Sequence, residues 1–370
     1  MDKTRDSSRP FRLLLTGGGT GGHLFPAVAA AEAMRERYPD SAILFVGTKR
    51  LLDRQSLTQA GFQVKTILSF GLKGKRLLEL IKACLVLPVA LVQAVIVLVR
   101  FRPDVVLGVG GYVTGPVVAT AWLLRIPTVI HEQNSIPGLA NRLLGRLARR
   151  VCLSIPVSNR FFAEEKTVLT GNPVRREVCE LAGHLKETND AFTVLVLGGS
   201  QGAHGVNELM VSLFSASSGL PAGIRIIHQT GARDADWVAQ RYHAAGVNAE
   251  VAAFFHDMAT IYTKGDVAVS RAGATTLAEL AVVGMPALLI PYPHAADDHQ
   301  RENGNWYVAG GGALMFAQDQ AGAARIGAEI TDLAHNPERR QAMAKAMAAR
   351  GTTEAATRLV DVCLEAADGR

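Results

Sequence analysis

Residues 11–26 read FRLLLTGGGTGGHLFP, and this stretch predicts how the chain begins to fold. A short apolar strand, Leu13–Leu15, leads into a loop of five glycines and one threonine, and His23 follows at once. Glycine allows sharp turns and lets a ligand approach the backbone closely. A helix is expected next, with Pro26 in its first turn, and its free N–H groups favour anionic ligands. The pattern therefore predicts a ligand site at this loop.

His23 is the candidate reactive group of that site. The positive end of a helix dipole disfavours the cationic form of a nearby histidine, so the neutral ring can act as a base near pH 7. A role in positioning an acceptor or in binding a phosphate is the alternative, and the residues alone leave both open.

A second strand–glycine–helix opening, TVLVLGGSQGAHGVNEL, occupies residues 193–209. Two such openings, about one domain apart, predict two nucleotide-binding halves with a cleft between them. Apolar strands alternate with helical segments in both halves, which indicates an α/β fold with mostly parallel sheets covered on both faces. The expected strands are LLLTG, AILFVGT, VVLGVGGY, TVIHEQN, VCLSI and TVLTGNP, followed by TVLVLGG, RIIHQTG, VAAFF, VAVSRAG and PALLIPYP. The final helix, 354–367, is expected to pack on either half.

Composition narrows the class of protein. The chain has 370 residues and a net charge of +6, enough length for two cores. Its four cysteines are scattered and its first ten residues lack an apolar segment, which favours a reducing cytosol over a secreted protein. Aromatic residues are few and arginine-rich repeats are absent from the sequence, so nucleic acid is a poor candidate partner.

The positive charge is concentrated between Lys49 and Arg102, where ten basic residues face two acidic ones. Within this region a basic loop precedes seventeen uncharged residues, Ala83–Val99, close to the minimum for a membrane span. Pro88 and Gln93 interrupt the stretch, which favours a buried helix preceded by an interfacial membrane patch over a true span. An ordinary amphipathic surface helix is the alternative. The patch is predicted to comprise Lys73, Lys75, Arg76, Leu77, Leu78 and Ile81.

Other motifs add candidate ligand contacts. The glycines at 17, 19 and 22 match a dinucleotide fingerprint, but the next strand ends in Gly47 and Thr48 without the required acid, which argues against NAD(P). Glu279 in SRAGATTLAE is placed to accept the hydroxyls of a ribose, unless it is a solvated glutamate on a capped helix. HEQN (131–134) ends a strand, and a polar loop at 291–303 carries Gln300 and Asn303. We interpret Asp234-Ala235-Asp236 as a helix start, not as a metal site.

GGGTGGHLFPA, GVGGYVTGP, HEQN, GNPVR, GGSQGA and SRAGATTLAEL, in this order, resemble the MurG family of bacterial N-acetylglucosaminyltransferases. The resemblance implies a GT-B fold of two Rossmann-like domains. The acceptor domain would comprise 1–172 and the returning helix 353–370, and the UDP-GlcNAc domain 173–352. The implied reaction is inverting transfer of N-acetylglucosamine from UDP-N-acetylglucosamine to the muramyl 4-hydroxyl of lipid I (undecaprenyl-pyrophosphoryl-MurNAc-pentapeptide), giving lipid II.

The resemblance also implies where the substrates bind, with His23 as base and with no cofactor or metal. A helix N-terminus at Ser200 would stabilise the departing UDP. The anionic cytoplasmic membrane surface is an implied partner, with peripheral attachment there, and other cell-wall enzymes are candidate partners. The implied contacts are Thr20, Gly21, Gly22 and Asn134 for the sugar; Arg175 and Ser200 for the nucleotide and diphosphate; Phe255 for uracil; Ala274, Thr275, Thr276, Leu277, Ala278 and Glu279 for phosphate and ribose; and Gln300 and Asn303 for sugar hydroxyls.

Three rival functions remain at this point. One is a GT-B transferase that glycosylates a membrane diacylglycerol, and another is an epimerase that interconverts a free UDP-sugar. The third is a scaffold protein with an inactive pocket, against which the intact glycine loops and His23 argue.

Overall fold

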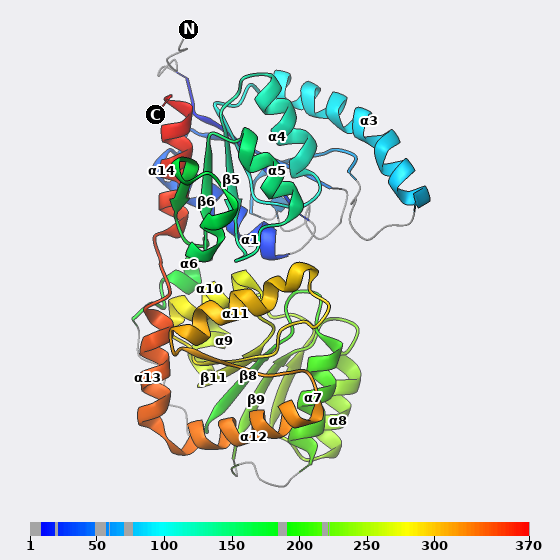
Figure 1. Cartoon of the computed structure of the whole chain (residues 1–370). Helices are drawn as coiled ribbons and strands as arrows, with labels where there is room; N and C mark the ends of the chain where they lie inside the picture. Colours follow the sequence, from blue (N-terminus) through cyan, green and yellow to red (C-terminus); the bar gives the residue numbers. More distant parts are fainter. Residues whose placement is uncertain are drawn as a thin grey trace. The chain divides into compact units, whose positions relative to one another are not determined.

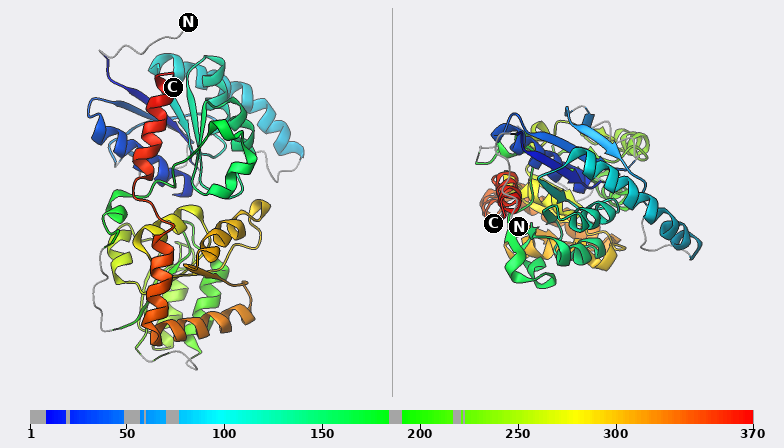
Figure 2. Two further views of the ribbon diagram at one scale, coloured as in Figure 1. Left: turned by 60° about the vertical axis from the view of Figure 1, so that its left-hand side comes forward. Right: turned by 90° about the horizontal axis from the view of Figure 1, so that it is seen from above.

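The computed structural model describes residues 9–18, 21–48, 57–58, 60–69, 77–183, 191–216, 221 and 223–369. The chain divides into two compact units. Unit 1 comprises Met1–Arg175 and Glu354–Arg370, and unit 2 comprises Arg176–Thr353. Each unit is a parallel sheet covered by helices, as Figures 1 and 2 show.

Unit 1 is built on a seven-stranded sheet in the order β3-β2-β1-β4-β5-β6-β7, and all neighbouring pairs are parallel. The predicted α/β class with parallel sheets is confirmed. Strand β3 was not predicted, because only Val64 of its four residues is apolar and even Val64 is only partly buried. The strands are β1 (Arg12–Thr16), β2 (Ala42–Gly47), β3 (Gln63–Thr66), β4 (Val105–Gly108), β5 (Thr128–Glu132), β6 (Arg150–Leu153) and β7 (Thr167–Leu169).

Helices cover both faces of the unit 1 sheet because successive side chains of each strand point to opposite sides. Leu13 and Leu15 pack with α1 and α14, whereas Leu14 packs with α3, α4 and α5. Figure 1 shows α14 and α3 on opposite sides of this sheet. The helices are α1 (Gly21–Arg37), α3 (Leu77–Phe101), α4 (Thr114–Leu123), α5 (Leu139–Leu147) and α14 (Ala355–Ala367), with 3-10 helices η1 (Pro156–Phe161) and η2 (Glu164–Lys166).

Helix α14 returns to unit 1, which the residues alone did not decide and the resemblance implied. Leu359, Val362 and Cys363 are buried in the same apolar cluster as Leu13. Arg37 on α1 forms an ion pair with Asp361 on α14, so the two helices are joined by charge as well as by packing.

Unit 2 has a six-stranded parallel sheet in the order β10-β9-β8-β11-β12-β13. Strand β13 was also missed by the sequence analysis, since it is only three residues long at a sheet edge. The strands are β8 (Thr193–Leu197), β9 (Arg225–Gln229), β10 (Ala249–Ala252), β11 (Val267–Ser270), β12 (Ala287–Leu289) and β13 (Ala313–Met315).

One face of this sheet is covered by α7, α8 and α12, which bury Val206, Tyr242 and Ile330 in a common cluster with Val194. The helices of unit 2 are α6 (Arg176–Cys179), α7 (His204–Ser215), α8 (Ala235–Ala244), α9 (Met258–Lys264), α10 (Ala274–Val283), η3 (Ala296–Asp298), α11 (His299–Ala309), α12 (Gln320–His335) and α13 (Pro337–Ala348).

Helix α3 corrects one expectation about the long apolar segment. Over the part of α3 whose side chains are described, residues 86–101, it is buried on one side only, at Ala90, Ala94 and Leu98, while Val92 and Ile96 on the other side are exposed. The prediction of a buried helix is therefore wrong for this part of α3. Among the described residues, no helix combines the length and the apolar character needed to cross a membrane. Lys73, Lys75 and Arg76 lie outside the described residues, as do the side chains of Leu77, Leu78 and Ile81.

Candidate active site

His23 is the third residue of α1, because this helix already begins at Gly21. Pro26 is consequently the sixth helical residue, in the second turn, and its expected place in the first turn was wrong. The His23 ring is half-buried, and its Nδ1 lies 3.1 Å from Oε1 of Gln133. Gly21 and exposed Gly22 open the helix beside it, and Thr20 lies outside the described residues.

Two glycines of the GVGGY segment, after strand β4, pack against the first glycine loop. A β-carbon on Gly110 would lie 3.0 Å from Cε1 and Nδ1 of His23, and one on Gly111 would lie 2.3 Å from the carbonyl oxygen of Gly18. Both have positive φ, 103° and 89°, which favours glycine. The backbone of this segment therefore lies close to His23 and Gly18, and a side chain at Gly110 or Gly111 would clash with them.

The HEQN segment brings buried polar groups to the end of β5, as its position after a strand predicted. His131 and Gln133 are both buried, and Gln133 Nε2 lies 3.0 Å from His131 Nδ1. Burial lowers the pKa of His131 to about 4, since the charged ring would lose its hydration. His131 is therefore neutral near pH 7.

Glu132 of the same segment holds Asn134, a predicted sugar contact. Its Oε1 accepts hydrogen bonds from the backbone N–H of Asn134 at 2.9 Å and from Asn134 Nδ2 at 3.1 Å. Its Oε2 accepts from Asn141 Nδ2 at 2.8 Å. Burial raises the pKa of Glu132, and the hydrogen bonds from Asn134 and Asn141 oppose that rise. The Asn134 amide is thus held by a buried carboxyl group.

Arg175, another predicted contact, lies at the end of the first segment of unit 1. Its guanidinium is 4.9 Å from the ring centroid of Phe25 on α1, a cation–π distance. This contact holds the arginine near the same end of α1 that carries His23.

The second glycine loop, 198–203, follows strand β8 as predicted. Ser200 lies in a turn within it, and helix α7 begins only at His204. The expected helix N-terminus at Ser200 was therefore wrong. Gly199 and Gly202 have φ of 79° and 77°, values outside the helical region, so the chain cannot enter the helix before Ala203.

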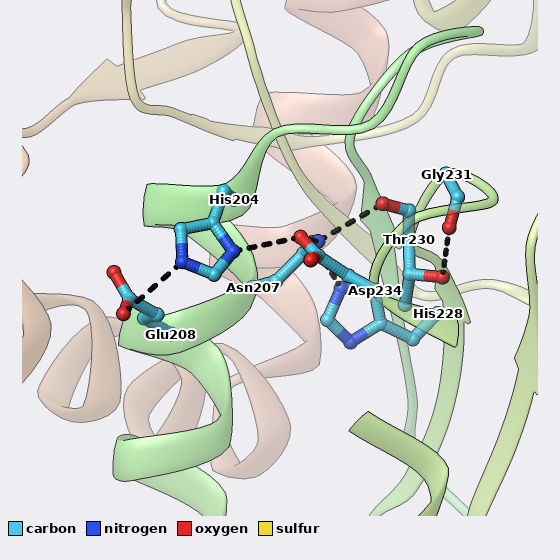
Figure 3. Close-up of polar contacts among 7 residues, drawn as sticks. All are labelled: His204, Asn207, Glu208, His228, Thr230, Gly231 and Asp234. Atoms are coloured by element: carbon cyan, nitrogen blue, oxygen red, sulfur yellow. Dashed lines mark hydrogen bonds and ion pairs between the residues drawn. The ribbon is translucent and has the colours of Figure 1, made fainter. Parts of the chain in front are cut away.

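This loop packs tightly against the end of β9. A β-carbon on Gly202 would lie 2.1 Å from the carbonyl oxygen of Thr230, and one on Gly231 would lie 2.6 Å from Gly202 Cα. Asn207 on α7 donates its Nδ2–H to the Thr230 carbonyl at 2.9 Å (Figure 3). The loop conformation is thus fixed by backbone contact and by α7.

A buried polar network lies below that loop (Figure 3). Asn207 Nδ2 also donates to Asp234 Oδ2, so the other amide atom, Asn207 Oδ1, faces His228. Oδ1 accepts a hydrogen bond from His228 Nε2 at 3.0 Å. His228 Nδ1 lies 3.0 Å from the Tyr242 hydroxyl, which then donates to it. Burial lowers the pKa of His228 to about 3, so its ring is neutral.

Asp234 begins α8, in agreement with the interpretation of Asp234-Ala235-Asp236 as a helix start. Its side chain accepts from His204 Nδ1 at 2.9 Å instead of capping its own helix. Burial acts to raise the pKa of Asp234, but hydrogen bonds from Trp237, His204 and Asn207 outweigh it and lower that pKa.

Gln229, at the end of β9, connects two predicted ligand segments that sequence reasoning did not link. Its Nε2 donates to the Gly199 carbonyl at 3.1 Å, and its Oε1 accepts the Phe255 N–H at 3.0 Å. The backbone N–H of Phe255, the predicted uracil contact, is therefore already hydrogen-bonded within the protein.

Helix α10 carries Ala274, Thr275, Thr276, Leu277, Ala278 and Glu279 after the turn at Gly273. Glu279 is only 5% exposed, and the buried Tyr262 hydroxyl donates to its Oε2 at 2.8 Å. The alternative of a solvated glutamate is wrong. The carboxyl group is buried and oriented by Tyr262, a residue for which no sequence motif indicated a role.

Gln300 and Asn303 lie on helix α11 and not on the expected polar loop. Gln300 Oε1 accepts from the Tyr292 N–H at 2.9 Å. Asn303 is fully buried and its Nδ2 donates to the Ala272 carbonyl at 3.2 Å, which connects α11 to the SRAG turn. Both amides thus hold neighbouring loops in place.

Comparison with known proteins places this geometry in a family. The glycosyltransferase family 28 N-terminal domain matches residues 13–153, and the family 28 C-terminal domain matches residues 193–359. A UDP-N-acetylglucosamine–N-acetylmuramyl-(pentapeptide) pyrophosphoryl-undecaprenol N-acetylglucosamine transferase from Desulfotalea psychrophila is 53% identical, covering 96% of this chain and 97% of that protein. This chain belongs to the MurG family. A MurG-family relative of the same name from Myxococcus xanthus is 42% identical over 96% of this chain and 92% of its own length.

Solved structures agree on the fold of this MurG-family chain. MurG from Acinetobacter baumannii superimposes with a TM-score of 0.75 at 28% identity, covering 96% of this chain and 100% of that one. UDP-GlcNAc 2-epimerase from Neisseria meningitidis gives a TM-score of 0.68 at 16% identity, over 96% and 100% of the two chains. At that identity the epimerase shares the fold alone. The GT-B prediction is confirmed.

Proposed function

We propose that this chain transfers N-acetylglucosamine from UDP-N-acetylglucosamine to the muramyl 4-hydroxyl of lipid I, giving lipid II and UDP with inversion at the anomeric carbon. The observation that carries the proposal is the 53% identity to a transferase of that name along 96% of the chain. The epimerase alternative is supported only by a shared fold, since the compared epimerase is 16% identical to this chain. The scaffold alternative does not explain why hydrogen bonds orient the side chains of His23 and Glu279.

Unit 1 would supply the base. In an inverting displacement the acceptor oxygen attacks the anomeric carbon as the bond to UDP breaks, and the hydroxyl proton must go to a nearby group. His23 would take that proton, supported by its place at the start of α1 and by its hydrogen bond to Gln133. Thr20, Gly21, Gly22 and Asn134 would contact the sugar.

Unit 2 would hold the nucleotide. Backbone N–H groups of the 198–203 turn, with Ser200, would stabilise the departing diphosphate. Arg175 stays a predicted contact of the nucleotide. Because the Phe255 N–H is bonded to Gln229, its carbonyl oxygen would accept from uracil. Glu279, oriented by Tyr262, would accept the ribose hydroxyls, and Ala274–Ala278 would lie along the phosphates. Gln300 and Asn303 would support the sugar side of the site.

Unit 1 would also dock on the anionic cytoplasmic face of the membrane, where lipid I is anchored. Exposed apolar side chains on α3, α4 and α5 support this proposal. Helix α3 packs beside α4 and α4 beside α5, so these side chains lie on neighbouring helices. Contiguous exposed apolar surface marks interaction sites, and adjacent basic residues favour anionic lipid. The apolar residues are Leu87, Val89, Val92, Val95, Ile96, Val99, Trp122, Leu123, Leu124, Leu139 and Leu143, and the exposed basic ones are Arg100, Arg125 and Arg146. The predicted patch at 73–81 lies outside these described side chains and stays a prediction. Other cell-wall enzymes attached to the same membrane are candidate partners.

The test is incubation of the purified full chain with UDP-N-acetylglucosamine and a lipid I analogue, with detection of the disaccharide product by mass spectrometry. Parallel reactions replace the acceptor with diacylglycerol or omit it. Product with the lipid I analogue alone supports the proposal. Glycosylated diacylglycerol, or interconversion of the free nucleotide sugar, would establish one of the rival functions instead.

A further inference from the structure

A series of hydrogen bonds connects the backbone carbonyl of Gly171 to the His23 ring through the side chains of His131 and Gln133. His131 Nε2 lies 3.0 Å from the Gly171 carbonyl oxygen, and His131 Nδ1 lies 3.0 Å from Gln133 Nε2. Gln133 Oε1 in turn lies 3.1 Å from His23 Nδ1. His131 and Gln133 are exposed by 0% and 1%, so protein groups and not bulk water decide which atoms donate.

The direction of each hydrogen bond follows from two backbone carbonyls that can only accept. Gln133 Nε2 lies 2.9 Å from the Val109 carbonyl oxygen, so the amide nitrogen must be on that side and Oε1 must face His23. The Gly171 carbonyl oxygen likewise requires the proton of neutral His131 on Nε2. His131 Nδ1 then accepts from Gln133, which fixes the same amide orientation a second time.

The contact with Gln133 decides which ring nitrogen of neutral His23 carries the proton. Gln133 Oε1 is an acceptor, so His23 Nδ1 must be the donor, and the neutral ring then carries its lone pair on Nε2. Gly110 lies beside the Cε1 and Nδ1 edge of the ring, since a β-carbon there would fall 3.0 Å from both atoms, and this limits movement of the ring toward Gly110.

We propose that Gln133 is a positioning residue that holds neutral His23 in the Nδ1-protonated tautomer, so that Nε2 is the atom that takes the proton of the acceptor hydroxyl. The inference rests on the proposed function, in which His23 is the base. It also assigns His131 a role, which is to fix the orientation of the Gln133 amide. Ser154 Oγ lies 3.1 Å from His131 Nε2 and can accept from the same N–H that donates to the Gly171 carbonyl. This contact does not change the direction of the hydrogen bonds between His131, Gln133 and His23.

The direct test is nitrogen-15 NMR of the full chain labelled at histidine, recorded near pH 8. His23→Ala identifies the His23 signals by their disappearance. We expect the Nδ1 shift of a protonated nitrogen and the Nε2 shift of an unprotonated one. A His23 ring protonated on Nε2 would overturn the inference, whatever the activity of the protein.

Gln133→Met and Gln133→Glu test the role of the amide oxygen. Methionine matches the shape but offers His23 no good acceptor, so the single tautomer should be lost. Turnover should fall roughly 10- to 100-fold, which is less than the whole contribution of a general base because His23 itself remains. KM for UDP-N-acetylglucosamine should stay within about twofold of that of the parent. A carboxyl oxygen of glutamate still accepts from His23, so Gln133→Glu should keep the Nδ1 proton. A Gln133→Met protein with unchanged turnover would contradict the proposal.

Ser158→Ala is the matched control for lost stability. It removes another buried hydrogen bond of unit 1, from Ser158 Oγ to the Ile155 carbonyl at 2.7 Å, away from His23. Turnover and the His23 signals should be those of the parent. Absence of transferase activity in the parent would reject the proposed function but leave the NMR result to decide the tautomer.

Discussion

Gly110 lies directly against the ring of His23, and a β-carbon at Gly110 would fall 3.0 Å from two ring atoms. Gly110→Ala should therefore displace the ring, and its φ of 103° adds backbone strain for alanine. We expect turnover to fall by roughly 10- to 100-fold, with UDP affinity unchanged because Gly110 is none of the proposed nucleotide contacts. Gly115→Ala is the control, since a β-carbon there meets nothing within 4 Å. Equal turnover in both variants would show that the Gly110 contact does not hold His23.

His23→Ala should reduce turnover by about two to four orders of magnitude if His23 is the general base. Affinity for UDP, measured by calorimetry, should stay near that of the parent. A positioning or phosphate-binding role predicts instead that KM for the lipid acceptor rises while turnover at saturation is largely kept. Steady-state kinetics with varied acceptor therefore separates the two roles.

Tyr262→Phe should weaken UDP binding because the Tyr262 hydroxyl orients Glu279. Loss of one hydrogen bond to a charged group costs about 1.5–3 kcal/mol, so we expect affinity to fall by roughly 10- to 150-fold at most. Glu279→Ala should weaken UDP and UDP-N-acetylglucosamine by similar factors, because both share the ribose. Calorimetry with 2′-deoxy-UDP is the discriminating control. If Glu279→Ala weakens the deoxy nucleotide as much as UDP, the carboxylate does not bind the 2′-hydroxyl.

Val92 and Ile96 project one helical turn apart from the exposed side of α3. The double change Val92→Ser, Ile96→Ser should reduce binding to anionic vesicles, since each buried apolar side chain contributes roughly 1–2 kcal/mol. Turnover on a soluble acceptor analogue should persist. Leu169→Ser, at an exposed apolar residue on β7, is the matched control. Sedimentation with vesicles at low and high salt measures the effect, and equal binding by all proteins would rule out this face.

The buried neutral His228 makes unit 2 less stable in acid. Its pKa is about 3 in the folded chain against an ordinary 6.5, so the unfolded state binds the extra proton as pH falls below 6.5. Between pH 7.5 and pH 5 this residue alone should lower the free energy of unfolding by about 2 kcal/mol. Denaturant titrations followed by fluorescence at both pH values measure the difference. His228→Gln should reduce the pH dependence, and an unchanged pH dependence would show that His228 does not contribute.

Much of the fold could be predicted, because nearly all core strands are apolar runs bounded by glycine or proline. The edge strands β3 and β13 could not, since edge strands bury few side chains and leave little apolar pattern. The start of helix α11 could not be predicted either, because PYPHAADDHQREN is mostly polar, whereas burial of Asn303 and its hydrogen bond to Ala272 fix the helix in the structure.

The reactive groups could be predicted more readily than their supports. His23 and Glu279 stand in glycine-rich or small-residue segments that mark a ligand site. Tyr262 and Gln229 do not, and their importance depends on partners 17 and 26 residues away that only the fold brings together. Gly110 does stand in a glycine-rich motif, GVGGY, but its contact with His23, 87 residues away, is visible only in the structure. The Gln133 amide is separated from His23 by 110 residues, so its orientation could not be inferred from local sequence.

The return of α14 to unit 1 has a consequence for synthesis of the protein. Unit 2 is one continuous segment and can fold as soon as it leaves the ribosome. Unit 1 lacks Leu359, Val362 and Cys363 until the whole of unit 2 has been translated, so its apolar cluster stays open on that side while unit 2 is made. The sheet of unit 1 is therefore synthesised before that of unit 2, but its core is completed after unit 2 has been made.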